Sequence, residues 1–229
     1  MKKRILLFVV LLLCILWLGT TSYAGSQKLS NLEYNVTLNA DGTADIVETW
    51  NIKITDTNTL FKTFELDSSK YGDITNVQVS EVTNTGVQSF VNSGKYAYHV
   101  DKGKFYALKR NNKEFEIAWG VSINDTQYKT YKISYRISNA IKNYNDCSEF
   151  YWQFVGKTNG IKADRVIGTV KLPHSVSTKE NLRVWAHGPL EGTIHAISDD
   201  TVQFEVPRTS YRNNGRSKNC YNRKCIFFE

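Results

Sequence analysis

Few residues of this sequence have the types and spacing that catalysis or metal binding requires. The histidines, His99, His174, His187 and His195, lie far apart in the chain and form no HExxH motif. The sequence also contains no G-x-S-x-G elbow and no phosphate-binding loop. His187 stands beside Gly188-Pro189, where a structural hydrogen bond is a commoner role than catalysis. We therefore expect no enzyme activity, no catalytic residue, no metal and no cofactor.

One cysteine and a few carboxylates are the remaining candidates for chemistry. Cys147 follows Asp146 and stands near Glu149, and such acidic neighbours raise a thiol pKa and make a poor nucleophile. The pair Asp199-Asp200 has the residue types of a calcium loop or a glycosidase, but its position between two apolar runs predicts a hairpin turn. A hydrolase using Asp199 or Glu149 needs a second carboxyl group facing the first. It is the weakest of our functional hypotheses.

Four tryptophans are the candidate ligand-binding residues. Trp50, Trp119, Trp152 and Trp185, together with many tyrosines, would form a sugar-stacking platform if they are exposed. In a β domain such rings more often fill the core. Solvent exposure separates the two interpretations, because four buried rings leave no platform.

The N-terminus has the layout of a secretory signal. Three basic residues at positions 2–4 precede fourteen apolar residues, 5–18, and small residues flank a cleavage position before Gly25. The apolar run is shorter than the ~18 residues of a spanning helix. We predict a signal-peptide helix over residues 1–24, with an uncleaved anchor as the alternative. Both place the protein outside the cytosol, on the outer face of the membrane or extracellular.

The charge is concentrated at the two ends of the chain. The formal net charge is +7, but residues 25–207 carry 20 basic and 21 acidic residues. A folded part without a basic surplus excludes nucleic acid as an expected partner. Only Cys147 falls within residues 25–207, so no disulfide framework supports this part. Its length is sufficient to bury a core without one.

Apolar residues recur at every second position, the period of a half-buried strand. Residues 32–38 and 44–54 alternate in this way on either side of a turn at 39–42, and Glu48 shares the apolar face of the second run. Further runs predict the strands 60–66, 74–82, 95–100, 114–123, 129–137, 150–155, 166–172, 182–186, 192–197 and 202–206. A turn of helix fits residues 139–145. We predict an all-β protein, an antiparallel β-sandwich of about ten to twelve short strands over residues 25–207, preceded by the signal-peptide helix.

Several stretches resemble the N-terminal domain of a family of membrane proteins catalogued as domain of unknown function 2207 (DUF2207). The resemblance spans about residues 30–207 and rests on the segments 32–36 and 41–48, on EFYWQFVG at 149–156 leading to 170–173, and on VWAHGPLEG at 184–192 leading to 204–207. It implies an export signal, an extracytoplasmic β domain and then transmembrane helices. It implies no established catalytic residues.

The chain departs from the family pattern after Pro207. No apolar strand follows directly, and residues 208–229 form a basic tail. Because two-fold codons in this tail yield apolar and β-branched residues when shifted by one base, we hypothesise that it is wholly or partly out of frame. The native protein would then continue into a membrane anchor. The alternative is a genuine basic tail that binds anionic lipid or wall polymers. On either view we expect the tail to lack a defined fold.

The leading functional hypothesis is a non-catalytic extracytoplasmic domain of a membrane-associated protein that binds or scaffolds at the cell surface. Its expected partners are the membrane and an unidentified cell-surface or protein partner. The rival is a secreted carbohydrate- or cell-wall-binding β-sandwich module that uses exposed tryptophans.

Overall fold

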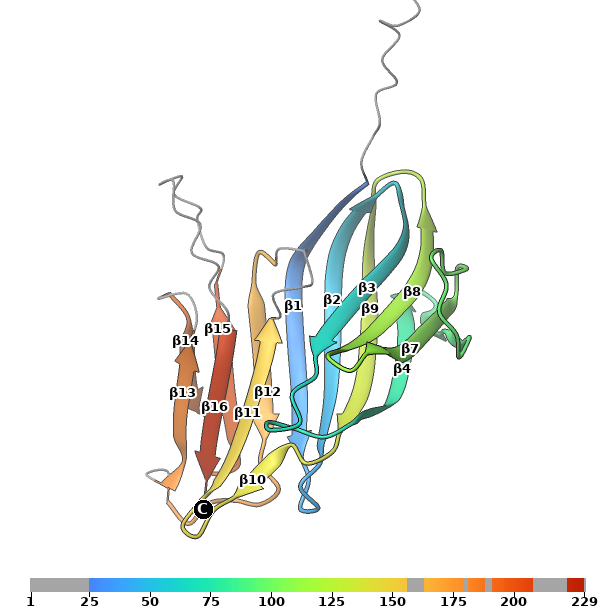
Figure 1. Ribbon diagram of the computed structural model, residues 1–229. Coiled ribbons are helices and arrows are strands. Elements are labelled where there is room, and N and C mark those ends of the chain that lie inside the picture. Colours follow the sequence, from blue (N-terminus) through green and yellow to red (C-terminus); the bar gives the residue numbers. More distant parts are fainter. Residues whose placement is uncertain (1–24, 156–162, 179–180, 188–190, 208–221, 229) are drawn as a thin grey trace, which may run out of the picture.

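A computed structural model describes residues 25–155, 163–178, 181–187, 191–207 and 222–228. These residues form an all-β protein with sixteen strands, which confirms the predicted fold class with more strands than expected. One layer is an eight-stranded sheet, and the facing layer is divided between two four-stranded sheets (Figure 1).

The large sheet has the order β14-β15-β12-β1-β2-β9-β4-β5. Its strands are β1 (Ser26–Leu38), β2 (Ala44–Thr55), β4 (Ile74–Thr83), β5 (Gly86–Ser89), β9 (Gln127–Ile137), β12 (Val166–Lys171), β14 (Thr193–Ala196) and β15 (Thr201–Val206). The sheet β3-β8-β7-β6 consists of β3 (Thr57–Glu65), β8 (Glu114–Ile123), β7 (Lys104–Asn111) and β6 (Val91–Asn92). The sheet β10-β11-β16-β13 consists of β10 (Ile141–Asn143), β11 (Ser148–Val155), β16 (Asn222–Phe228) and β13 (Arg183–His187).

The β1–β2 hairpin shows how the alternating residues form these strands. Tyr34 and Val36 on β1 and Ile46 on β2 are buried, while their chain neighbours face outward. Gly42 has a φ of 80°, a left-handed conformation that glycine adopts without a steric penalty. The chain therefore reverses at the predicted turn, and β2 pairs with β1 over its whole length.

The direction of two strands differs from the purely antiparallel expectation. β12 runs parallel to β1, pairing Leu32–Thr37 with Val166–Lys171, and the short β6 runs parallel to β7. Alternation specifies which face of a strand is buried, but not which neighbour it pairs with or in which direction.

Two local predictions are wrong. Residues 95–100 form no strand. The strand that pairs with β8 on the side away from β3 is β7, which follows residues 95–100 in the chain. The helical turn over residues 139–145 is absent, because Asn139 has a left-handed φ of 49° that interrupts a helix. The amides of Ala140 and Ile141 donate to the carbonyl of Gly42 instead, at 2.9 and 3.2 Å.

The two ends of the chain are only partly described. Residues 1–24 and 208–221 lie outside the described residues, so the signal peptide stays a prediction. The described residues contain no helix long and apolar enough to cross a membrane.

Residues 222–228 form β16, where we expected no defined fold. β16 lies between β11 and β13 and pairs antiparallel with both. Each of these strands would otherwise present an unpaired backbone edge, so a strand at this position satisfies two edges at once.

We expect a chain that ends at Pro207 to be less stable than the full chain. Without β16, the backbone edges of β11 and β13 that pair with it are left open. Thermal unfolding should show a melting temperature lower by at least about 5 °C, and a peptide of residues 222–228 should restore part of the loss. Equal melting temperatures for the two chains would contradict the structural role of β16.

Candidate functional site

A buried ion pair joins the two layers. Glu48 on β2 and Lys62 on β3 have side chains that are 0% and 3% exposed, and Lys62 Nζ lies 2.5 Å from Glu48 Oε1. Tyr135 Oη donates to the same carboxylate oxygen at 2.6 Å, and Trp50 Nε1 donates to Oε2 at 2.9 Å. Both carboxylate oxygens therefore have hydrogen-bond donors, which offsets the loss of water around the charge.

The ammonium group of Lys62 is surrounded by aromatic rings. It lies 5.4 Å from the ring centroid of Tyr34 and 4.9 Å from that of Phe64, within the range of cation–π attraction. It also donates to Tyr34 Oη at 3.4 Å, and Tyr34 Oη donates to the carbonyl oxygen of Phe154 on β11. The cluster therefore connects the large sheet to both sheets of the facing layer.

Burial and the nearby Glu48 carboxylate hold the pKa of Tyr34 and of Tyr135 well above the usual value of a phenol. Both hydroxyls consequently keep their protons and act as donors. Since the cluster is buried and its charges are matched, we interpret it as structural. Sequence reasoning placed Glu48 on an apolar face but drew no conclusion from it. Lys62, between Leu60 and Phe64, carries the same signal.

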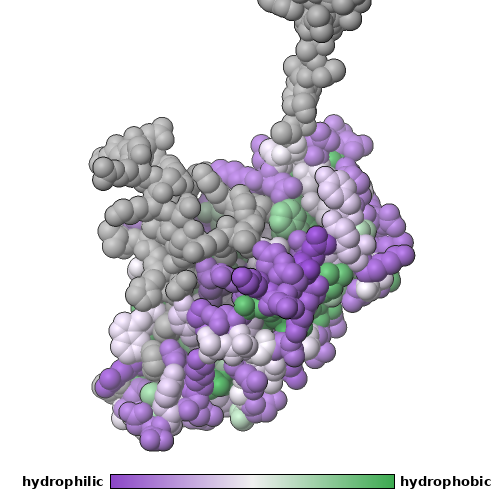
Figure 2. All heavy atoms as spheres, viewed as in Figure 1, coloured by the Kyte–Doolittle hydropathy of each residue, from purple (hydrophilic) through white to green (hydrophobic). Residues whose placement is uncertain are grey.

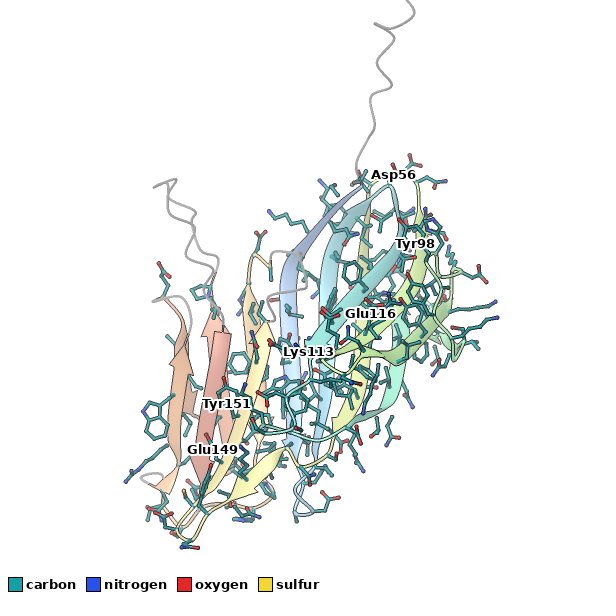
Figure 3. The ribbon with its side chains drawn as sticks, in the orientation of Figure 1. Asp56, Tyr98, Lys113, Glu116, Glu149 and Tyr151 are labelled. Atoms are coloured by element: carbon teal, nitrogen blue, oxygen red, sulfur yellow. The ribbon has the colours of Figure 1, made fainter. Side chains whose placement is uncertain are left out.

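A groove open to solvent lies on the outer face of the β3-β8-β7-β6 sheet. Its volume is about 450 Å³, and its walls are the start of β1, the segment 56–61, the loop residues 96–99 and outward side chains of β7 and β8. That volume lies within the ~300–1,000 Å³ typical of small-molecule sites. In Figure 3, Asp56 and Tyr98 lie near one end of the sheet and Glu116 lies further along β8.

The floor of the groove comes from a cross-strand row of three residues. Phe61 on β3 pairs with Ala118 on β8, and Ala118 pairs with Tyr106 on β7. Residues directly opposite each other share one face of a sheet, so the small Ala118 side chain lies between two aromatic ones. Val100 of the loop 93–103 packs on Ala118 and Tyr106, which are 1% and 3% exposed, so these two residues form the buried base of the groove.

The loop 93–103 forms one wall of the groove. It packs so closely on β8 that a Cβ atom at Gly120 would lie 2.1 Å from the carbonyl oxygen of Asp101. Only glycine permits this approach. The amide of Val100 donates to Thr59 Oγ1 at 3.0 Å, which ties the loop to β3. The position of the loop is therefore set by contacts with two strands.

Polar and aromatic side chains within the groove hold one another in place. Tyr106 Oη donates to Glu116 Oε1 at 2.6 Å, and Arg110 Nε lies 3.7 Å from the same oxygen. The guanidinium carbon of Arg110 is 3.8 Å from the ring centroid of Tyr96, whose ring meets Tyr106 edge-to-face at 5.6 Å. Partial burial and the Glu116 carboxylate raise the pKa of Tyr106, so this hydroxyl stays protonated.

Three aromatic side chains of the groove remain accessible. Tyr98 is 80% exposed, Tyr96 48% and Phe61 41%. The ring of Tyr98 meets His99 edge-on at 4.7 Å. Sequence reasoning missed Tyr96 and Tyr98 because the run 95–100 suggested a strand, and it placed Phe61 in the predicted strand 60–66 without marking it as a candidate.

Three of the four candidate tryptophans fill the core, the role that such rings more often have in a β domain. Trp50, Trp119 and Trp152 are at most 3% exposed, and the rings of Trp50 and Trp119 meet edge-to-face across the two layers at 5.2 Å. Trp185 on β13 is 49% exposed, on a different sheet from the groove. The four tryptophans therefore form no common platform.

The other candidate residues lie apart from one another. His99 lines the groove and His195 is on β14, while the side chain of His187 lies outside the described residues. His174 follows β12 and its Nδ1 lies 3.4 Å from the carbonyl oxygen of Ser175. Within the described ranges, no three His, Cys, Asp or Glu side chains gather in a metal-binding arrangement.

The carboxylates and the cysteine behave as the sequence predicts where the structure describes them. Asp199 and Asp200 lie in the turn between β14 and β15, and Asp200 Oδ1 accepts hydrogen bonds from two neighbouring hydroxyls. Glu149 Oε2 accepts a hydrogen bond from Tyr144 Oη at 2.9 Å. Desolvation and the adjacent Asp146 raise the pKa of the Cys147 thiol, the direction expected for an unreactive thiol.

Comparison with known families gives a match over most of the chain. Residues 28–213 match the family described as "Predicted membrane protein (DUF2207) N-terminal domain". The chain belongs to this family. The match includes the segments that suggested the resemblance and covers most of β1 and all of β2 through β15. The buried ion pair and the groove lining other than Gly25 and Gln27 therefore lie within the DUF2207 domain. A search of curated proteins found no match.

Comparison with solved structures gives matches at low sequence identity. A Legionella pneumophila protein described as a "putative nutrient binding protein" has a TM-score of 0.50 and 10% identity, over 88% of this chain and 67% of that one, and at this identity the similarity concerns the fold alone. A Parabacteroides distasonis "putative protease" has a TM-score of 0.46 and 12% identity, over 87% of this chain and 40% of that one. An M1 zinc metallopeptidase of Deinococcus radiodurans has a TM-score of 0.36 and 8% identity, over 88% of this chain and 42% of that one.

We expect Lys62→Met to destabilise the domain by about 3–5 kcal/mol, because it leaves the Glu48 carboxylate buried without its countercharge. The double variant E48Q/K62M should recover most of this loss. Arg136→Met is the matched control, since it breaks a half-exposed pair with Asp45, which lies on the same strand as Glu48, and a pair exposed to water contributes far less than a buried one. Urea denaturation measures all three. A loss for Lys62→Met no larger than the control's would contradict the structural role of the pair.

The domain should lose stability in alkaline solution. Burial raises the pKa of Tyr71 to about 12, and those of Tyr34 and Tyr135 are also raised above the value of about 10 expected in the unfolded chain. The unfolded chain therefore releases these protons first, so this stability is complete below pH ~10 and falls as the pH rises through 12. Urea midpoints at about pH 8 and about pH 11 test this, and the difference should shrink in Y34F/Y135F. The prediction fails if the variant keeps the full difference.

Proposed function

We propose that residues 25–207 form a non-catalytic binding domain on the outer face of the cell membrane, in a protein that is membrane-associated. Membership of a family of membrane proteins supports the association, and the charged, apolar and small-residue layout of residues 1–24 supports export. The observation that carries the binding role is the open, aromatic groove, whose walls are held in place before any ligand binds.

Binding fits the groove better than catalysis does. Glu116 is engaged by Tyr106 and Arg110, an arrangement that positions side chains rather than one that moves a proton. The carboxylates considered for a hydrolase, Asp199 and Glu149, lie in a hairpin turn and on β11, away from this groove. We therefore propose that bound ligand leaves the domain chemically unchanged.

The location of the domain can be measured in intact cells. The full chain with a C-terminal tag should be digested by protease added outside the cells, whereas a chain lacking residues 1–24 should be protected. Both chains should be digested after lysis. Protection of the full chain in intact cells would overturn the extracytoplasmic location.

A further inference from the structure

We infer that the groove on the β3-β8-β7-β6 sheet binds a neutral glycan, a polyhydroxylated chain without net charge. This inference deepens the proposed function, since it names the ligand class of the same groove. It rests on three properties of the groove: its exposed rings, its polar rim and its shape.

The exposed rings provide stacking surfaces. Phe61 comes from β3, and Tyr96 and Tyr98 come from the loop 93–103, so the rings stand on two sides of the groove. The face of an aromatic ring is electron-rich and attracts the weakly positive C–H groups that a sugar presents on its flat side. Arg110 lies 3.8 Å from the centroid of Tyr96, so it orients this ring and covers one of its faces, while Tyr96 keeps 48% of its surface exposed. Little side-chain entropy is then lost at Tyr96 on binding. The ring of Tyr98 meets His99 edge-on and is 80% exposed.

The polar rim suits hydroxyl groups. Gln27, Asp56 and Asn58 line one end of the groove, while Arg110 and Glu116 line the other. This set includes both donors and acceptors, and a sugar hydroxyl can serve as either. The Arg110 guanidinium lies beside the Glu116 carboxylate and compensates its charge, while Asp56 adds a negative one. An anionic ligand therefore meets no surplus of positive charge, which favours a neutral one.

The shape of the groove suits a segment of a chain. It is open to solvent rather than enclosed, so a short part of a longer chain can occupy its ~450 Å³. A folded protein partner would instead need a broad apolar patch. Figure 2 shows small apolar areas separated by hydrophilic residues on the visible face.

The test measures binding of soluble tetrasaccharides of glucose and of N-acetylglucosamine to the full chain purified after export, by isothermal titration calorimetry. Tetra-alanine is the peptide comparison. We expect at least one tetrasaccharide to bind and tetra-alanine not to bind. The affinity should be unchanged by added salt, because no charge is neutralised.

Two tyrosine variants locate the binding. Tyr98→Ala should weaken sugar binding about five- to tenfold through loss of one stacking ring. The matched control is Tyr128→Ala, which removes a similarly exposed tyrosine, 75% accessible, from β9 outside the groove and should leave the affinity unchanged. Because both side chains are largely exposed, both variants should keep the melting temperature of the parent.

The outcomes separate this inference from the proposed function. The inference that the groove binds a neutral glycan would be overturned by any one of three results. These are no binding of either tetrasaccharide, equal weakening by both tyrosine variants, and stronger binding of tetra-alanine than of the sugars. None of these results bears on the protease test of location. A domain protected from external protease that nonetheless binds glycan through Tyr98 would overturn the location and keep the ligand class.

Discussion

The buried ion pair between Glu48 and Lys62 is the interaction on which the arrangement of the two layers depends. Removing two charges from water is unfavourable unless each finds its countercharge and its hydrogen bonds. Here Lys62 is the countercharge of the Glu48 carboxylate, and Tyr135 and Trp50 donate hydrogen bonds to it. These contacts form together only when β3 lies across β2 at one position. An apolar contact tolerates a shift along the strand far better than this pair does, so the pair specifies how the layers align.

That alignment determines what the outer face presents. With Leu60, Lys62 and Phe64 inward, alternation leaves Phe61 outward, opposite Ala118 of β8. A slip of one residue would bring Phe61 to the core and Lys62 to the surface, exchanging every contact on both sides. The packing of the core therefore determines which side chains of β3 face the groove. The same strand that buries the lysine carries the exposed phenylalanine, and the loop 93–103 completes the site from across β8.

The fold was predictable to the extent that local patterns determine it. Strands such as β2 and β9, the turn at Gly42 and the hairpin at Asp199-Asp200 follow from alternation and turn residues. The parallel β1–β12 pair and the strand β16 do not, because pairing partners far apart in sequence leave no local signal. β7 pairs with the next strand in the chain, but its burial does not alternate, since the adjacent Phe105 and Tyr106 are both buried. The candidate site was missed for a related reason. Tryptophans were the conspicuous rings, yet the sandwich interior buries three of them. The exposed rings of the groove are Phe61, on the outer side of β3, and Tyr96 and Tyr98, in a loop whose pattern resembles a strand.

The division of the second layer into two sheets separates the groove from the end of the chain. β3 and β8 carry the groove, whereas β11 and β13 hold β16, and the two sheets meet at side chains such as Phe64 and Trp152, whose ring centroids are 6.2 Å apart. The Glu48 cluster spans this junction, since Lys62 belongs to one sheet and Tyr34 Oη donates to the Phe154 carbonyl of the other. A change in residues 222–228 therefore acts first on the β11 side of the junction. Such a change affects the groove only through the Glu48 cluster, in which the charges are already paired. The structure of the groove therefore depends little on which strand lies between β11 and β13.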